Sequence, residues 1–195
     1  MVREVTFKVK VYQFDELSEE VKEKVLDNYR FIMVEYFNWW ESVYEDAENI
    51  GLEIVEFDLD RRYIRMKLKE NILSSIEEAL NLFNKDSNEY KIVKEYYDEI
   101  MKLKDSEEVK EYLKDNPEHD PYDAIYNLNL GEEFEDEYVK DMSRFFLKML
   151  EEEFEYLTSD EAIIEMFEAN DYEFFETGKV FYEREFVSNN ELKVI

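Results

Sequence analysis

The sequence predicts an α+β fold in which a small antiparallel sheet, made of an N-terminal strand and hairpins, packs with a larger set of helices. Residues 5–11 alternate apolar and polar side chains, which is typical of a half-buried strand. Apolar runs at 52–57 and 63–68 flank a turn at 58–62 with four charged residues, as in a β-hairpin. From residue 70 onward, apolar residues recur every three or four positions, which indicates helices, one of them long and acidic.

Two helices are expected among these first strands. Ser18 stands before two glutamates, and this order of an N-cap residue and acidic residues predicts a helix over 19–29. A second helix is expected over 36–50, ended by Gly51 as a C-cap residue, because apolar residues share one of its faces. These residues are Tyr36, Trp40, Val43, Tyr44, Ala47 and Ile50.

The two tryptophans of the chain are adjacent, and the helical period separates them. Trp40 falls within the apolar face, so we expect it in the core. Trp39 falls at the flank of that face, and two readings stay open. It is either a boundary residue with a half-covered ring or an exposed anchor for a partner, since tryptophan is enriched in interface hot spots.

The rest of the chain is expected to be mainly helical. The expected helices cover 72–83, 90–101, 109–113, 132–157 and 158–169, and the last begins at a capping box. The apolar face of the longest is expected to hold Phe134, Tyr138, Met142, Phe145, Met149, Leu150, Phe154 and Leu157. A hairpin over 172–186 with Gly178 in its turn should follow.

The length of 195 residues fits one domain, so we expect a single α+β domain over 1–195. A sub-division is possible at the loop 115–123, which contains both prolines. The chain has no cysteine, which excludes disulfides and fits a reducing cytoplasm. The N-terminal residues lack a signal-peptide pattern, and no stretch approaches the roughly 18 apolar residues that span a bilayer. We therefore expect a cytoplasmic protein without a membrane partner.

Acidic residues are the strongest functional signal. The formal net charge is −28, and residues 132–176 contribute a net −14 with 17 acidic and 3 basic residues. This surplus disfavours direct binding of nucleic acid and favours a basic protein as the partner. As one helix, the segment would carry about one charge per 5 Å, roughly a third of the density of B-DNA. Imitation of DNA would therefore need neighbouring acidic faces, and a merely solvated helix face is the plainer interpretation.

Metal binding and catalysis have little support. His119 is the one histidine, and although Glu118 and Asp120 flank it, a single imidazole cannot build a multi-histidine zinc or iron site. There is no cysteine nucleophile, and three glycines leave no phosphate-binding loop. We expect no enzyme activity, no cofactor and no metal.

Three segments carry a resemblance to a known group of proteins. They are FDELSEEVKEKVLDNYR, WWESVYEDAENIGLEIVEFDLDR and EEFEYLTSDEAIIEMFEANDYEFFETGK, which together cover most of both ends of the chain. They resemble a largely uncharacterised family of small acidic proteins of bacteriophages and other mobile elements, some of them labelled antitoxin-like. The resemblance implies a phage or mobile-element setting and carries over no catalytic or binding residue.

The leading hypothesis is a non-enzymatic inhibitor that occupies a basic nucleic-acid-binding surface of a host defence protein, such as a CRISPR effector, a restriction enzyme or a defence nuclease. The expected partner-binding residues are Glu132, Glu133, Glu137, Glu151, Glu152, Glu155, Asp160, Glu161 and Trp39. The alternative is an antitoxin-like or regulatory protein-binding module that does not imitate nucleic acid. An accessory enzyme or small-ligand binder is a third class, which a polar pocket around His119 would favour.

Overall fold

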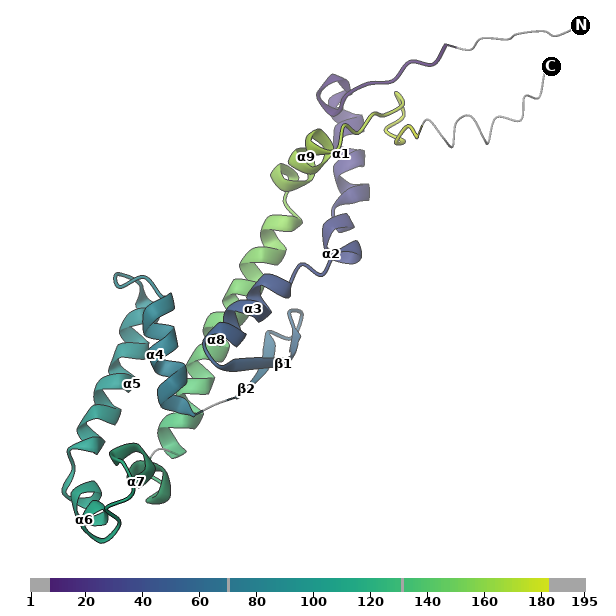
Figure 1. The fold of residues 1–195 in the computed structure, drawn as a ribbon. Helices are drawn as coiled ribbons and strands as arrows, with labels where there is room; N and C mark the ends of the chain where they lie inside the picture. Colours follow the sequence, from purple (N-terminus) through teal and green to yellow (C-terminus); the bar gives the residue numbers. More distant parts are fainter. Residues whose placement is uncertain (1–7, 70, 131, 183–195) are drawn as a thin grey trace, which may run out of the picture. The chain divides into compact units, whose positions relative to one another are not determined.

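The structure is a computed structural model that describes residues 8–69, 71–130 and 132–182, with the backbone alone at 132 and 133. It is an α+β fold, mostly helical, with a two-stranded antiparallel sheet of β1 (Leu52–Asp58) and β2 (Tyr63–Leu68) (Figure 1). The helices are the 3-10 helix η1 (Phe14–Glu16), α1 (Glu19–Tyr29), α2 (Ile32–Tyr36), α3 (Glu41–Asn49), α4 (Ile72–Leu82), α5 (Asn88–Lys104), α6 (Glu107–Asp115), α7 (Pro121–Asn127), α8 (Glu132–Leu157) and α9 (Asp160–Ala169).

The chain divides into two compact units. The terminal unit combines Met1–Trp39 with Phe154–Ile195, and the central unit is Trp40–Glu153. The long helix α8 contributes to both, because the boundary after Glu153 lies within it. These boundaries differ from the expected sub-division at 115–123, which lies inside the central unit.

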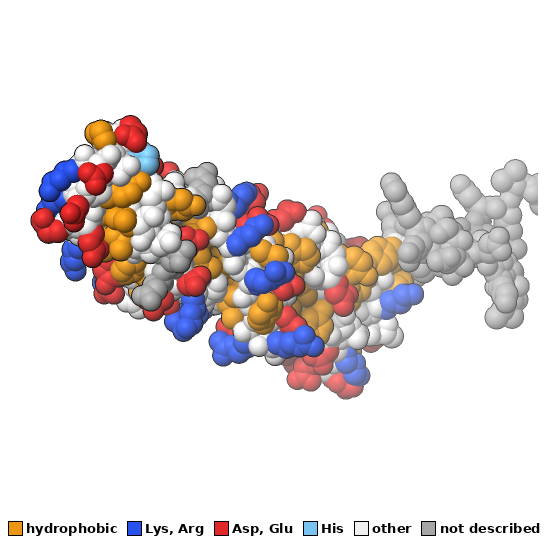
Figure 2. Space-filling model, turned by 90° about the horizontal axis from the view of Figure 1, so that it is seen from below, with side chains coloured by type: hydrophobic (Ala, Val, Ile, Leu, Met, Phe, Trp, Pro, Cys, Tyr) orange, Lys and Arg blue, Asp and Glu red, His pale blue; other side chains and the backbone are white. Residues whose placement is uncertain are grey.

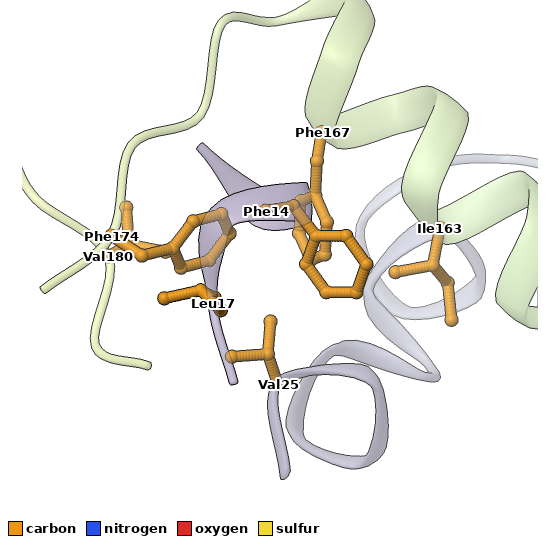
Figure 3. Close-up of a cluster of buried hydrophobic side chains, with 7 residues drawn as sticks. All are labelled: Phe14, Leu17, Val25, Ile163, Phe167, Phe174 and Val180. Atoms are coloured by element: carbon orange, nitrogen blue, oxygen red, sulfur yellow. The ribbon is translucent and has the colours of Figure 1, made fainter. Parts of the chain in front are cut away.

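The core of the terminal unit joins the two ends of the chain. Its buried residues are Phe14, Leu17, Val25, Ile163, Phe167, Phe174 and Val180 (Figure 3). Helix α9 supplies two of them, and Ser159 begins this helix by accepting a hydrogen bond from the Ala162 N–H at 3.2 Å. The rings of Phe167 and Phe174 meet edge to face, with centroids 5.1 Å apart.

Position 178 in this core requires glycine for two reasons, its backbone conformation and the closeness of neighbouring side chains. Its φ is +84°, a conformation that residues with a side chain rarely adopt. A Cβ atom at this position would lie 2.8 Å from Val25 Cγ2 and 3.0 Å from Val21 Cγ1. Glycine therefore allows the loop 170–182 to approach α1 closely, and the expected turn at this residue is present.

In the central unit, α3 packs on the hairpin of β1 and β2. The strands pair from Leu52 with Leu68 to Asp58 with Tyr63, and a bulge lies between Ile54 and Glu56. Helix α3 buries Val43 and Ala47 on one face and ends before Gly51, whose φ of +71° fits a C-cap residue. The hairpin and this C-cap were both predicted from the sequence.

The buried face of α8 in the central unit consists of Tyr138, Met142, Phe146 and Leu150, at intervals of four residues. Phe146, which the sequence analysis did not include, is fully buried, whereas Phe145 and Met149 are half-buried. The predicted face was therefore wrong by part of a turn. The rotation follows from the tertiary contacts, since Phe145 packs against Phe83 at the end of α4 with ring centroids 5.0 Å apart.

A buried polar group joins α8 to α4. The Ser75 hydroxyl donates to the Ile50 carbonyl oxygen and lies 2.9 Å from the Tyr138 hydroxyl. Because the single Ser75 proton is used by Ile50, Tyr138 acts as the donor to Ser75 Oγ. Burial raises the pKa of Tyr138 to about 12. Each of the two hydroxyls therefore has a hydrogen-bond partner in an otherwise apolar core.

Several predicted elements differ from the structure. The expected helix over 36–50 is interrupted, because α2 ends at Tyr36 and α3 starts at Glu41. Of the expected N-terminal strand 5–11, residues 5–7 lie outside the described ranges, and residues 8–11 are not part of the sheet of β1 and β2. The neighbouring Tyr12 forms an isolated antiparallel bridge with Phe174.

The end of the chain and the proline loop also differ in part. The expected hairpin over 172–186 is reduced to an isolated bridge between Phe174 and Val180, and 183–186 lie outside the described ranges. Helix α7 was not predicted. It begins at Pro121 behind the N-cap residue Asp120, whose side chain accepts from the N–H groups of Tyr122 and Asp123. Within the described ranges, no helix combines the length and apolar composition needed to cross a membrane.

Candidate protein-binding surface of the terminal unit

Helix α9 presents opposite faces to the core and to solvent. Ala162, Ile163 and Phe167 are buried, and the remaining positions of the helix follow from its period. Glu161, Glu165 and Glu168 are exposed and share the opposite face, since they are four and three residues apart. We call these three residues the α9 acidic stripe.

The α9 acidic stripe has no cationic side chain within ion-pair distance among the described residues. The Tyr156 hydroxyl donates to Glu165 Oε2 at 3.1 Å. Residues 160–176 contain seven acidic and no basic residues, so the neighbouring sequence offers no compensation. The negative charge of this stripe is therefore available to a partner.

Carboxylates on α1 have a different environment. Glu19 pairs with Lys22 at 2.9 Å and Glu20 with Lys24 at 2.6 Å, and the latter contact lowers the pKa of Glu20. Two of the four carboxylates of α1 are therefore paired within the helix. Exposed pairs of this kind contribute little stability, so their main effect is on the surface potential.

Asp160, one of the residues expected to bind a partner, has an internal role. Arg30 Nη2 lies 2.9 Å from Asp160 Oδ1, and Arg30 Nη1 donates to the Thr158 carbonyl oxygen at 3.0 Å. The carboxylates of Asp160 and Asp27 raise the pKa of Arg30. This arginine links α1 to the start of α9, so Asp160 helps to hold the helix in place.

The other expected partner-binding carboxylates lie in both units. Glu155 and Glu161 are exposed in the terminal unit, and Glu137 is exposed in the central unit. In the central unit, Glu152 pairs with Lys148 at 3.3 Å. The side chains of Glu132 and Glu133 lie outside the described part of the structure.

Glu151 differs from the other carboxylates because it is half-buried. Its Oε1 lies 2.9 Å from Arg62 Nε, in the turn after β1, and its side chain is 24 % exposed. Glu151 therefore joins α8 to the β-hairpin inside the central unit. Reversing its charge would place two cations side by side and disturb the fold.

The two tryptophans do not differ in burial as predicted, because both are half-buried. Trp40 is half-buried rather than in the core, and its ring lies 6.4 Å from that of Phe57. The prediction failed because the helix breaks between α2 and α3, which makes Trp40 the N-cap residue of α3. Trp39 is half-buried against Phe154, with ring centroids 5.7 Å apart, as a boundary residue would be.

An aromatic groove of about 900 Å³ lies on the terminal unit. Its walls come from α1, α2, α9 and the loop 170–182, and they include Tyr29, Met33, Tyr36, Phe37, Met166 and Tyr182. Burial, together with the neighbouring Tyr182 and Tyr172, raises the pKa of Tyr29, so this phenol is neutral at physiological pH. The groove can therefore receive apolar groups.

The His119 region has contacts that fit a structural role. The His119 Nδ1 atom lies 2.9 Å from the Tyr112 hydroxyl and 3.3 Å from Asn127 Nδ2. These contacts join α6 to α7 through neighbouring side chains. In the described part of the chain, no group of three or more metal-ligating side chains is positioned to hold an ion.

Charge is mixed on one face of the molecule. Figure 2 shows acidic side chains in red among basic ones in blue and hydrophobic ones in orange. That face is not a continuous acidic surface. The concentration of uncompensated charge is a property of particular helices, such as α9.

Sequence reasoning missed two parts of this surface. Glu165 and Glu168 could have been found, because a helical wheel of the predicted helix 158–169 places both beside Glu161. The apolar segment 31–37 also stands out in the sequence, but its exposure depends on where the helices end.

Comparisons with family models, curated proteins and solved structures return no significant match. The resemblance to acidic phage proteins therefore stays a prediction.

Proposed function

We propose that the protein is a non-enzymatic acidic inhibitor of a phage or mobile element, acting in the cytoplasm of a bacterial host. Its target would be a host defence protein with a basic nucleic-acid-binding surface, such as a CRISPR effector, a restriction enzyme or a defence nuclease. The inhibitor would occupy that surface in place of DNA or RNA. The observation that carries the proposal is the α9 acidic stripe, whose carboxylates are exposed and lack cationic partners among the described residues.

The spacing of these carboxylates can be compared with that of phosphates. Glu161 and Glu168 are seven residues apart, so the three carboxylates extend over about 10 Å, or about one charge per 5 Å. One strand of B-DNA carries about one phosphate per 3.4 Å of helix axis. The stripe thus has about two thirds of the charge density of a single strand, so it supports imitation of one strand better than of a duplex.

The lack of internal pairing also favours a charged partner. A carboxylate that is already paired must lose its cation before it can bind another one, whereas those of the stripe need only lose water and, at Glu165, the hydrogen bond from Tyr156. Opposite charge across an interface accelerates association and selects the partner, even where its net contribution to affinity is small. Binding through the stripe should therefore be fast and sensitive to salt.

A second candidate function has its own supporting observation. The apolar segment 31–37 is not buried and adjoins the aromatic groove, as expected for a surface that binds an apolar part of a protein. This favours the antitoxin-like or regulatory alternative, in which the target is a protein and nucleic acid is not imitated.

The experiment begins with the target, captured from host lysate and then purified. Binding is measured between about 0.05 M and 0.5 M salt, with and without competing DNA or RNA, because electrostatic steering is screened over about 10 Å at 0.1 M. The test variant is Glu161→Lys/Glu165→Lys, which reverses two charges of the stripe. We expect its affinity to fall at least about tenfold at low salt, which corresponds to about 1.4 kcal/mol.

A matched control is Glu95→Lys/Glu99→Lys on α5, where two exposed glutamates have the same spacing. It changes the net charge equally and should leave affinity nearly unchanged. Thermal unfolding checks the fold, since lysine in the first turn of α9 costs about 0.3–1 kcal/mol. Affinity that is independent of salt, together with no competition by nucleic acid, would reject imitation and support the alternative.

A further inference from the structure

Residues 31–37 of the terminal unit form an apolar segment without a buried side chain. Six of the seven residues in FIMVEYF are apolar, and the segment includes the whole of α2. Phe31 is 49 %, Tyr36 77 % and Phe37 63 % exposed. A short helix of this composition normally buries a face, so its exposure is a local conflict between sequence and packing. Such conflicts are expected at binding sites.

The same segment forms one wall of the aromatic groove. Helix α9 also lines the groove with Met166, and the loop after it lines the groove with Tyr172 and Tyr182. Aromatic residues and methionine are enriched at protein interfaces, and the flexible thioether of methionine adapts to different side chains. A groove open to solvent, with a volume of about 900 Å³, has room for several apolar side chains of one bound segment.

The charges around the groove select among possible occupants. The terminal unit, Met1–Trp39 with Phe154–Ile195, has 19 acidic and 9 basic residues, a net charge of −10. Lys24 and Lys179 both line the groove, and Glu20 compensates the charge of Lys24 at 2.6 Å. Glu35 is a further lining residue, and Asp171, Glu173 and Glu176 adjoin lining residues in sequence. An apolar occupant that also carries positive charge fits this surface best.

We infer that the groove binds an amphipathic segment of a partner protein, with apolar side chains on one face and lysine or arginine on the other. The apolar face enters between α2 and Met166, and the basic residues meet the surrounding carboxylates. This is the helix-in-groove mode of peptide recognition, with anchors at positions such as i, i+3 or i+4 and i+7. The inference rests on the proposed function for the class of partner, a protein with a basic surface.

Other occupants fit the charges less well. A second copy of this chain would bring together two molecules that each carry −28, and nucleic acid would place phosphates beside carboxylates. Residues 183–195 carry three acidic and two basic residues, so they have no excess of positive charge. The following test distinguishes binding of a partner segment from occupation of the groove by a second copy or by residues 183–195.

The test uses the full chain and a synthetic probe. The probe is a labelled peptide of about 18 leucine and lysine residues with a helical amphipathic pattern. Peptides of the same composition in scrambled order, and with glutamate in place of lysine, are its controls. Fluorescence anisotropy should show saturable binding of the amphipathic leucine–lysine peptide that is at least about tenfold tighter than binding of either control, as a pocket with aromatic anchors predicts.

Tyr36→Ala/Phe37→Ala should weaken this binding at least about tenfold, because exposed aromatic anchors are removed. The matched control is Tyr126→Ala/Leu128→Ala in the central unit, where the two side chains are 81 % and 37 % exposed. It should bind the probe like the unchanged protein. Both variants remove exposed side chains, so circular dichroism and thermal unfolding should show intact folds.

Each alternative outcome overturns the inference. Equal affinity of Tyr36→Ala/Phe37→Ala and the unchanged protein, or equal binding of the scrambled peptide, would mean that the groove is not the site. Sedimentation that shows a dimer dissociated by the same variant would assign the groove to a second copy. Tighter probe binding after Phe186→Ala would assign it to residues 183–195.

The outcomes also separate this inference from the proposed function. If the groove variant leaves target binding intact while Glu161→Lys/Glu165→Lys abolishes it, the groove inference fails and imitation of nucleic acid stands. If the groove variant weakens binding of the probe and the target while nucleic acid does not compete, the groove inference stands and imitation fails.

Discussion

Replacing Tyr138 with phenylalanine should change how the stability of the central unit depends on pH. Tyr138 is fully buried, and burial raises its pKa from 10.0 to about 12. In the unfolded chain this phenol loses its proton near pH 10, whereas in the folded protein it keeps the proton until about pH 12. Its contribution is therefore complete below pH 10 and is lost as pH rises from 10 to 12.

The size of the change in stability follows from the pKa shift of Tyr138. Each pKa unit corresponds to about 1.4 kcal/mol, so Tyr138 should lower the free energy of unfolding by about 1.4 kcal/mol at pH 11 and by more as pH approaches 12. Tyr138→Phe removes this sensitivity but also removes the hydrogen bond to Ser75. That loss should cost about 1 kcal/mol at pH 7, since Ser75 keeps Ile50 as its partner.

The two stability curves should consequently cross at about pH 11, above which Tyr138→Phe becomes the more stable protein. Urea unfolding followed by circular dichroism at steps between pH 7 and pH 11.5 measures this. Tyr96, whose pKa is also raised by burial and by Asp141, is present in both proteins and largely cancels in the difference. Curves that stay parallel over this whole pH range would refute the reasoning.

Further substitutions test other parts of the fold. Trp39→Ala and Trp40→Ala should lower the free energy of unfolding by similar amounts, about 1–3 kcal/mol each in urea titrations, because both rings are half-buried; a loss above this range for Trp40 alone would place it in the core after all. Gly178→Ala should cost about 1–3 kcal/mol through its positive φ and the crowding by α1, and a neutral result in thermal unfolding would contradict the described turn. Arg30→Ala should lower the free energy of unfolding by about 1–2 kcal/mol, whereas Arg61→Ala should lower it by almost nothing, because the Arg61 side chain is 84 % exposed. Equal losses in paired denaturation curves would contradict the internal role of Arg30.

The helices and the β-hairpin could be predicted because their signals are local. The period of α8 and the alternation in β1 and β2 repeat over many residues, and no distant contact is needed to see them. Helix α7 also had a local signal, since Asp120 before Pro121 is a good helix start, although the two prolines indicated a break.

The candidate surface could be predicted only in part. That Glu161 is exposed follows from the period of α9, but the pairing of Glu151 with Arg62 joins residues 89 positions apart and has no local signal. Similarly, the apolar pattern through Tyr36 and Trp40 fits one continuous helix, and nothing in it reveals the break at 37–40. Contacts that decide exposure are set by tertiary packing, which the period of a single helix does not contain.

The order of the two units along the chain has a consequence for synthesis. The terminal unit needs Phe14 and Val25 to meet Phe167 and Val180, so its core closes a loop of more than a hundred residues. The central unit is one uninterrupted stretch, and its hairpin and its α4–α5 pair connect near neighbours. On a ribosome, the central unit can therefore begin to fold before α9, which the N-terminal helices of the other core need as a partner, has been synthesised. During that interval Phe14 and Val25 lack the side chains that later bury them. The time needed to synthesise the last forty residues therefore sets when the apolar side chains of this core are buried.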